Sequence, residues 1–311
     1  MASVADRSTR SSRKIAVSGA TGLIGKALCD ALRARGDVVC PIVRSAKGQP
    51  GEVVWDTEAQ AFDADALAAC DAVVHLAGEN IVGRWTPEKK QRVRDSRVEG
   101  TRALSETLAK LDDGPRTLIC ASAIGYYGDT GQSDAHTEDA PPGDDYLAEV
   151  CVAWEAACEA ARAAGLRVVN ARVGIVLSPQ GGALDAMLMP FRIGLGGRLG
   201  DGRQWMSWVS LADMARILLF ALDTPTLQGP VNAAAPEPAT NREFTQTLGK
   251  VLGRPTLLPV PSFAPKLLYG KEAAEALVLG SIRVVPERLR DAGFVFDHPT
   301  LEAALRHELD R

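Results

Sequence analysis

The first half of the chain alternates short apolar runs with longer segments in which apolar residues recur at helical spacing. The apolar runs predict strands at 15–17, 37–45, 52–55, 71–77, 116–121 and 166–172. The longer segments predict helices at 26–35, 63–69, 86–111 and 144–164. Strands that alternate with helices favour an α/β fold, here a Rossmann-type doubly wound parallel sheet.

The pattern changes after residue 174. Residues 178–202 are rich in glycine and interrupted by proline, and residues 255–265 are rich in proline. The other segments predict strands at 205–209 and 231–233, and helices at 211–222, 241–252, 271–279 and 300–309. We therefore expect a disordered arm over 1–13, a sheet domain over 14–235 whose residues 174–205 contribute to the substrate side, and a smaller, mostly helical C-terminal substrate domain over 236–311.

A glycine-rich turn, Gly19-x-x-Gly22-x-x-Gly25, joins the first strand to the first helix. Gly19 permits a tight turn, Gly22 lets the backbone approach a pyrophosphate, and Gly25 lets the helix pack close to the strand. The N–H groups at the helix N-terminus favour phosphate binding, although the same turn is also compatible with simple packing. The residues expected at this part of a dinucleotide site are Gly19, Thr21, Gly22, Leu23, Ile24 and Gly25.

The second strand indicates which dinucleotide binds. It ends near Arg44, and the next carboxylate along the chain is Glu52. NAD binders usually place an acidic residue here to accept the ribose 2′-OH, whereas a guanidinium suits a 2′-phosphate. We therefore expect NADP in preference to NAD; the alternative is that Arg44 is a solvated charge at a strand end.

Composition limits the other possibilities. The 311 residues are 46% hydrophobic and 24% charged, which is typical of a soluble protein with one large or two smaller domains, and a net charge of −4 does not indicate a nucleic-acid partner. No apolar run approaches the ~18 residues of a membrane span, and the N-terminus lacks the apolar region of a secretory signal. Six cysteines and four histidines are scattered without metal-binding spacing. We expect a cytoplasmic protein with reduced, mostly buried thiols, no metal and no membrane partner.

Three further segments support a resemblance, namely residues 73–78 (VVHLAG), 121–128 (ASAIGYYG) and 208–213 (WVSLAD). With the glycine turn, they resemble the extended short-chain dehydrogenase/reductase superfamily, of the NAD(P)-dependent epimerase/dehydratase type. Residues 78–101 and the tail from 232 onward resemble more closely a subfamily called epimerase family protein, which has its own C-terminal domain of unknown function. The resemblance covers residues 14–308.

The resemblance implies roles for matching positions. Residues bordering the adenosine and nicotinamide riboses would be His75, Leu76, Ala77 and Gly78. Ser122 would occupy the catalytic Ser/Thr position, and Tyr146 would occupy the position of the catalytic tyrosine.

The chain departs from the superfamily in lacking its Tyr-x-x-x-Lys pair, in which a lysine stabilises the tyrosinate. The residues four positions after the tyrosines are Thr130, Gly131, Val150 and Ala273, and no lysine occurs between Lys110 and Lys250. Three interpretations remain open. Arg97 or Lys90 substitutes for the lysine, Tyr126 or Tyr127 does the acid/base work, or the proton machinery is lost.

The substrate side is expected around residues 196–208, where Trp205 and Trp208 could stack on a ring or could instead be fixed at a domain interface. Expected substrate contacts are Asn80, Arg84, Tyr126 and Trp205. The sequence thus predicts an NADP(H)-binding oxidoreductase or epimerase-like protein, a monomer or homodimer. It would transfer a hydride to or from a small polar substrate such as a sugar nucleotide or a carbonyl compound. The alternative is a regulatory or redox-sensing NADP(H)-binding protein with little or no turnover.

Overall fold

The computed structural model describes residues 11–132 and 134–311. The strands of its main sheet are β1 Lys14–Ser18, β2 Val38–Val43, β3 Val53–Asp56, β4 Ala61–Phe62, β5 Ala72–His75, β6 Thr117–Ala123, β7 Arg167–Val173 and β11 Gly229–Ala233. Within the described residues they form one eight-stranded sheet in the order β11-β7-β6-β5-β1-β2-β3-β4. All neighbours are parallel except β3 and β4. The order reverses between β1 and β5, the place where open α/β sheets bind ligands.

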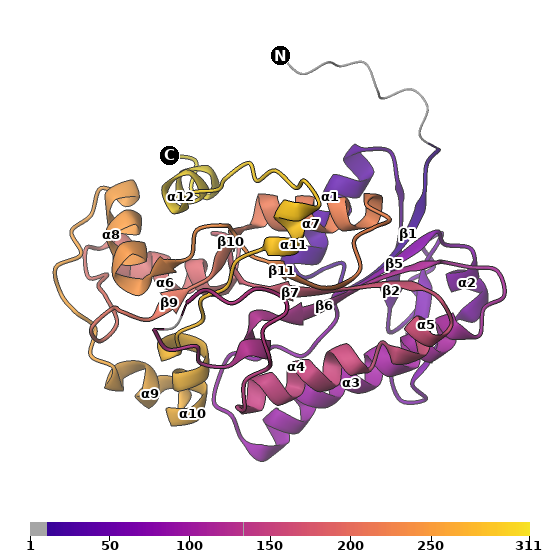
Figure 1. Ribbon diagram of the computed structural model, residues 1–311, viewed down its shortest axis with the longest axis horizontal. Helices are drawn as coiled ribbons and strands as arrows, with labels where there is room; N and C mark the ends of the chain where they lie inside the picture. Colours follow the sequence, from indigo (N-terminus) through magenta and orange to yellow (C-terminus); the bar gives the residue numbers. More distant parts are fainter. Residues whose placement is uncertain (1–10, 133) are drawn as a thin grey trace, which may run out of the picture.

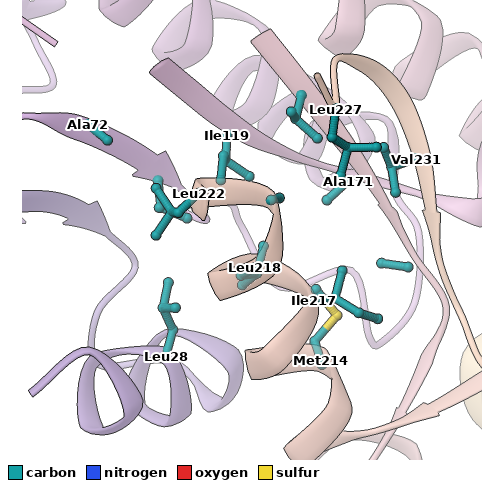
Figure 2. Close-up of a cluster of buried hydrophobic side chains, with 14 of the residues drawn as sticks. Leu28, Ala72, Ile119, Ala171, Met214, Ile217, Leu218, Leu222, Leu227 and Val231 are labelled. Atoms are coloured by element: carbon teal, nitrogen blue, oxygen red, sulfur yellow. The ribbon is translucent and has the colours of Figure 1, made fainter. Parts of the chain in front are cut away.

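Helices cover both faces of this sheet (Figure 1). One face packs against α1 (Leu23–Ala34) and α7 (Leu211–Asp223), and the other against α2 (Ala64–Ala68), α3 (Pro87–Ala109), α4 (Tyr146–Ala156) and α5 (Glu159–Ala163). Figure 2 shows the first of these cores, in which Leu28 of α1 and Leu218 of α7 lie beneath Ile119 and Ala171 of the sheet. The expected Rossmann-type doubly wound sheet is confirmed.

Of the two long helices expected from the sequence, the structure has the first as one helix and divides the second in two. α3 begins as predicted, with the Thr86 side chain accepting the Lys89 N–H and Pro87 in the first turn. The helix expected at 144–164 is instead divided into α4 and α5. The Ser105 hydroxyl of α3 accepts the N–H of Ala161, which in one continuous helix would bond to the Ala157 carbonyl. This contact between helices could not be predicted from the sequence.

The second half of the chain adds a smaller, mostly helical region. Its strands are β8 Ile175–Leu177, β9 Trp205–Met206, β10 Trp208–Ser210 and β12 Ala239–Thr240, in two small sheets. Its helices are α6 Gly182–Arg192, α8 Asn241–Leu252, α9 Phe263–Tyr269, α10 Lys271–Ala274, a π-helical turn Glu275–Leu279, α11 Glu287–Asp291 and α12 Leu301–Glu308. The sequence did not predict α6, because Pro190 lies inside it.

The beginning of the chain lies mostly outside this description. Residues 1–10 of the disordered arm expected over 1–13 are outside the described residues. Arg13, the last residue of the expected arm, is held on the fold by an ion pair to Asp223 at 2.5 Å. No helix in the described part of the chain is both long and apolar enough to cross a membrane.

Candidate functional site

The glycine-rich turn lies at the carboxyl end of β1. Gly19 has a φ of +65°, a conformation that L side chains rarely adopt, and its carbonyl accepts the Gly22 N–H at 2.9 Å. A Cβ at Gly25 would overlap the Gly19 carbonyl, so Gly25 is needed for close packing. Gly22 differs, because its φ of −73° is ordinary and a Cβ there would meet only the Gly19 oxygen at 3.3 Å. Its other side is open to a ligand.

Helix α1 leaves its N-terminus free for an anion. No side chain caps the helix, and its first turn holds no acidic residue. Thr21 is exposed, whereas Leu23 and Ile24 are half-buried. The backbone N–H groups of this turn and the positive end of the helix dipole therefore suit a phosphate group.

Arg44 lies immediately beyond the end of β2 and is exposed. Within the described part of the chain, its guanidinium makes no hydrogen bond or ion pair. Glu52 is turned away, because its carboxylate accepts the N–H groups of Lys47 and Gln49 at 2.7 and 3.2 Å. Since β2 pairs with β1, this unpaired cation lies at the same sheet edge as the glycine turn.

The end of β5 holds one buried residue, His75, and the three residues that follow it are at least partly exposed. Ser18 Oγ accepts the N–H groups of Leu76 and Ala77 at 2.9 and 3.0 Å, so it donates its proton to His75 Nδ1 at 2.8 Å. His75 is fully buried, and burial lowers its pKa to about 4. Its neutral side chain fixes the junction between β1 and β5 and does not reach the crevice, in contrast to the expected ribose contact. Leu76, Ala77 and Gly78 are partly exposed there.

A cation lies directly behind Gly78. A Cβ at Gly78 would come within 3.3 Å of the Arg97 guanidinium carbon. Arg97 donates to the carbonyls of Glu79 and Val93 at 2.9 and 3.1 Å. Of the two cations expected to replace the missing lysine, Arg97 is therefore fixed beside the crevice by backbone contacts.

Tyr146 lies in the first turn of α4, as expected, but its hydroxyl group is already engaged. It donates to the Lys90 carbonyl at 2.7 Å, and Trp85 packs against the ring edge-on. The Lys90 ammonium lies 4.3 Å from the centre of the ring and pairs with Glu272 at 2.6 Å. Burial raises the pKa of Tyr146, although Arg97 opposes that shift. The surroundings thus disfavour the tyrosinate that a Tyr-x-x-x-Lys pair would stabilise.

Helix α4 meets the 3₁₀ turn Ile124–Tyr127 through Leu147 and Cys151. A Cβ at Gly125 would lie 3.4 Å from Leu147 Cβ and 4.0 Å from Cys151 Sγ. These two α4 residues are four positions apart and share one helix face. Burial raises the pKa of Cys151 to about 12, so its thiol stays protonated.

Ser122 belongs to a buried ionic network that sequence reasoning missed. Its hydroxyl donates to Glu155 Oε1 at 2.7 Å. Arg172 holds the same carboxylate from two nitrogens, Nε to Oε1 at 2.8 Å and Nη2 to Oε2 at 2.9 Å. The Arg172 side chain is only 3% exposed. The available signal was an arginine within the apolar strand 167–173, because a buried charge needs a partner.

The tyrosines of the 3₁₀ turn complete this network. Arg172 Nη1 donates to the Tyr127 hydroxyl at 2.8 Å, which in turn donates to Asn232 Oδ1 at 2.7 Å. Burial raises the pKa of Tyr127 to about 12. The Arg172 guanidinium carbon lies 3.4 Å from the centre of the Tyr126 ring. Both tyrosines thus stabilise a buried cation.

The expected substrate residues are spread along the junction with the C-terminal region. Asn80 closes a local turn by accepting the Val82 N–H at 2.9 Å, and Arg84 donates to the Leu267 carbonyl of α9 at 3.1 Å. Trp205 lies against Arg283, whose guanidinium carbon is 4.1 Å from the indole centre. Trp208 is fully buried and packs in the core of the C-terminal region, which favours a structural role for it over stacking on a substrate.

A cavity of about 210 Å³ opens between the strand ends and the C-terminal helices. Its lining residues are Trp85, Gly125, Gly128, Asp129, Asp145, Tyr146, Leu147, Glu272, Glu275, Ala276, Gly280 and Ile282. The six cysteines are free and buried elsewhere in the fold. Among the described residues, no three His, Cys, Asp or Glu side chains are grouped so that they could hold a metal ion.

Comparison with known proteins agrees with this geometry. The chain matches the NAD dependent epimerase/dehydratase family over residues 15–234 and a domain of unknown function, DUF1731, over residues 260–308. The epimerase family protein Mb2239 of Mycobacterium bovis is 47% identical over 298 residues, which are 96% of this chain and 98% of that protein.

Two solved structures share the fold over 96% of this chain. The human epimerase family protein SDR39U1 (isoform 2), crystallised with NADPH, is 36% identical with a TM-score of 0.85, and 99% of that chain is covered. A nucleoside-diphosphate sugar epimerase from Corynebacterium glutamicum is 34% identical with a TM-score of 0.80, and 58% of that chain is covered. The resemblance found in the sequence is confirmed: this chain belongs to the NAD dependent epimerase/dehydratase family.

Proposed function

We propose that this protein is an NADP(H)-dependent oxidoreductase or epimerase-like enzyme that acts on a small polar substrate. The proposal rests on two features that lie at the same sheet edge. One is the uncapped N-terminus of α1, and the other is the exposed guanidinium of Arg44, which has no partner among the described residues. The first suits a pyrophosphate, and the second suits a ribose 2′-phosphate. The NADPH present in the human relative supports the same assignment.

The chain's own residues fit this dinucleotide. The open side of Gly22 allows the backbone to approach the pyrophosphate, and the exposed stretch from Leu76 to Gly78 follows the strand next to β1. Arg97, behind Gly78, is positioned to place a positive charge near the nicotinamide ribose. When bound, NADPH supplies a hydride from nicotinamide C4.

The two hydroxyl groups expected to transfer a proton are both engaged in hydrogen bonds within the protein. Ser122 directs its proton at Glu155, and Tyr146 directs its proton at the Lys90 carbonyl. For Tyr146 to protonate a substrate oxygen, its hydrogen bond to Lys90 must first break. We therefore expect slow turnover, and the same observation favours a second candidate function, an NADP(H)-binding regulatory or redox-sensing protein without turnover.

The first test is to titrate the purified protein with NADPH and with NADH, following nicotinamide fluorescence, for the wild type and for Arg44→Ala. Loss of the contact to the 2′-phosphate should cost about 1.5–3 kcal/mol, which is tenfold or more in the Kd for NADPH. NADH binding should not change. Arg33→Ala is the matched control, because Arg33 is an exposed arginine at the far end of α1, paired only with Asp30.

The outcomes separate the hypotheses. If neither nucleotide binds, the glycine turn serves packing alone and both candidate functions are wrong. If both bind equally and Arg44→Ala has no effect, the assignment of Arg44 is wrong. Where NADPH binds, its oxidation by a panel of carbonyl compounds supports the enzyme, and tight binding without oxidation supports the regulatory protein.

A further inference from the structure

The charged side chains that line the cavity are all acidic. Its charged lining side chains are Asp129, Asp145, Glu272 and Glu275, and no lysine or arginine of the described chain lines it. Asp129 accepts the Gly131 N–H and Asp145 accepts the Ala148 N–H, so both are fixed acceptors. A phosphate placed here would meet carboxylates and no cationic donor.

The cations that border the cavity are already engaged. Lys90 pairs with Glu272 at 2.6 Å, and Lys266 pairs with Glu275 at 2.7 Å. Arg84 donates to the Leu267 carbonyl. Recognition of a diphosphate ordinarily uses free arginine or lysine donors. Binding an anion here would require breaking these pairs.

An apolar surface adjoins this part of the molecule. Its large side chains are at least 57% exposed, and we call them the apolar rim: Met189, Ile193, Leu195, Leu257, Leu258, Phe263, Leu267 and Leu268. The rim comes from two segments, residues 189–195 and 257–268. Two hydrogen bonds join the chain next to these segments, from Arg254 Nε to the Arg192 carbonyl and from the Val260 N–H to the Arg198 carbonyl, each at 2.8 Å. α6 and α9, which carry half of the rim residues, lie at the same end of the molecule (Figure 1).

Two contacts bring the elements that carry the apolar rim close to the crevice. In the first, a Cβ at Gly182, in the first turn of α6, would lie 3.7 Å from Leu23 at the start of α1. In the second, Arg84 joins the segment after β5 to α9. Clusters of exposed apolar side chains beside a cavity commonly mark ligand-binding or interaction surfaces.

We propose that the substrate has an uncharged polar head, which enters the cavity, and an apolar tail, which covers the apolar rim, and that it is not a phosphorylated or nucleotide-linked sugar. This inference rests on the proposed NADP(H) function. The cavity volume of about 210 Å³ is consistent with a small head. Sites that enclose a whole drug-sized ligand usually measure roughly 300–1,000 Å³.

The test compares two sugar probes on NADPH-saturated protein by isothermal titration calorimetry: octyl β-glucoside, below its micelle concentration, and UDP-glucose. We expect octyl β-glucoside to bind at least about tenfold more tightly than UDP-glucose, because its tail is removed from water. Leu267→Asp, on the apolar rim, should weaken octyl β-glucoside at least about tenfold. Val295→Asp is the matched control, since Val295 is 72% exposed and lies outside both the rim and the cavity lining.

Three results would overturn the inference. They are equal or tighter binding of UDP-glucose, absence of octyl β-glucoside binding, and equal weakening by Leu267→Asp and Val295→Asp. Sedimentation equilibrium adds a fourth, because a dimer that Leu267→Asp dissociates would make the apolar rim a subunit interface. Nicotinamide fluorescence in the same samples tests the proposed NADPH binding separately. If NADPH does not bind, the octyl β-glucoside titration can still be carried out on the protein alone, so failure of the proposed function is distinguished from failure of this inference.

Discussion

At the scale of single residues, the ionic network around Arg172 shows how the usual serine position is used in this chain. Ser122 is 2% exposed, and its proton is committed to a carboxylate that Arg172 holds from two nitrogens. A buried charge is tolerated only when its partner is in place. Ser122 thus helps to satisfy the charge pair at the end of β6.

Removing the charge of Glu155 should therefore destabilise the fold. We expect Glu155→Gln to lower the free energy of unfolding by about 3–5 kcal/mol, because Arg172 would stay buried without its counter-ion. Chemical denaturation measures this. Glu159→Gln is the control: Glu159 is 73% exposed and paired with Arg162 on the next turn, so its loss should change stability by no more than about 0.5 kcal/mol. Equal effects of the two substitutions would contradict the network's importance.

At the scale of an element, two glycines of the turn between β1 and α1 have different surroundings and therefore different expected roles, Gly25 in folding and Gly22 in the proposed nucleotide binding. Gly25 packs against the Gly19 carbonyl, whereas Gly22 has an ordinary backbone conformation and an open side. The sequence motif assigns both to the same fingerprint. Their structural surroundings predict different consequences for substitution.

We expect Gly22→Ala to leave the stability of the apoprotein within about 1 kcal/mol of the wild type while weakening NADPH binding, because the new methyl group occupies space on the ligand side. Gly25→Ala should instead destabilise the protein itself, since its Cβ overlaps backbone and something must shift. Thermal unfolding without ligand and an NADPH titration measure the two effects. Unchanged stability of Gly25→Ala would refute the packing role.

At the scale of the whole molecule, two helical layers enclose a sheet whose interior holds an ionisable ring. His75 is fully buried with a folded pKa of about 4, against 6.5 for the free side chain. The unfolded chain therefore binds a proton more readily than the folded one. The stability that His75 contributes is present above pH 6.5 and is lost as the pH falls toward 4.

Between pH 7 and pH 4, this linkage should cost about 3 kcal/mol of unfolding free energy, at about 1.4 kcal/mol for each unit of pKa shift. His75→Gln should remove that part of the pH dependence, whatever its effect on stability at pH 7. Denaturation midpoints measured across this range test the prediction. His307→Gln provides the control, because it removes an exposed histidine and leaves His75 in place.

The sequence by itself determined the features that depend on neighbours along the chain. The alternation of apolar runs and helical segments predicted the doubly wound sheet, because the period of burial reflects the element that is buried. The glycine turn and Arg44 could be assigned since their spacing from the strand ends places them at one sheet edge. Local cap residues likewise predicted the start of α3 at Thr86.

Only the tertiary structure decided what depends on residues from separate elements. Glu155 of α4 and Arg172 of β7 meet because α4 packs on the sheet beside β6, and α5 separates from α4 because Ser105 of α3 takes a backbone N–H. The partial burial of Trp205 and the full burial of Trp208 also follow from packing. Apolar periodicity records which face of an element is buried. It does not record which partner each buried polar group meets, since that depends on the register and crossing of elements far apart in the chain.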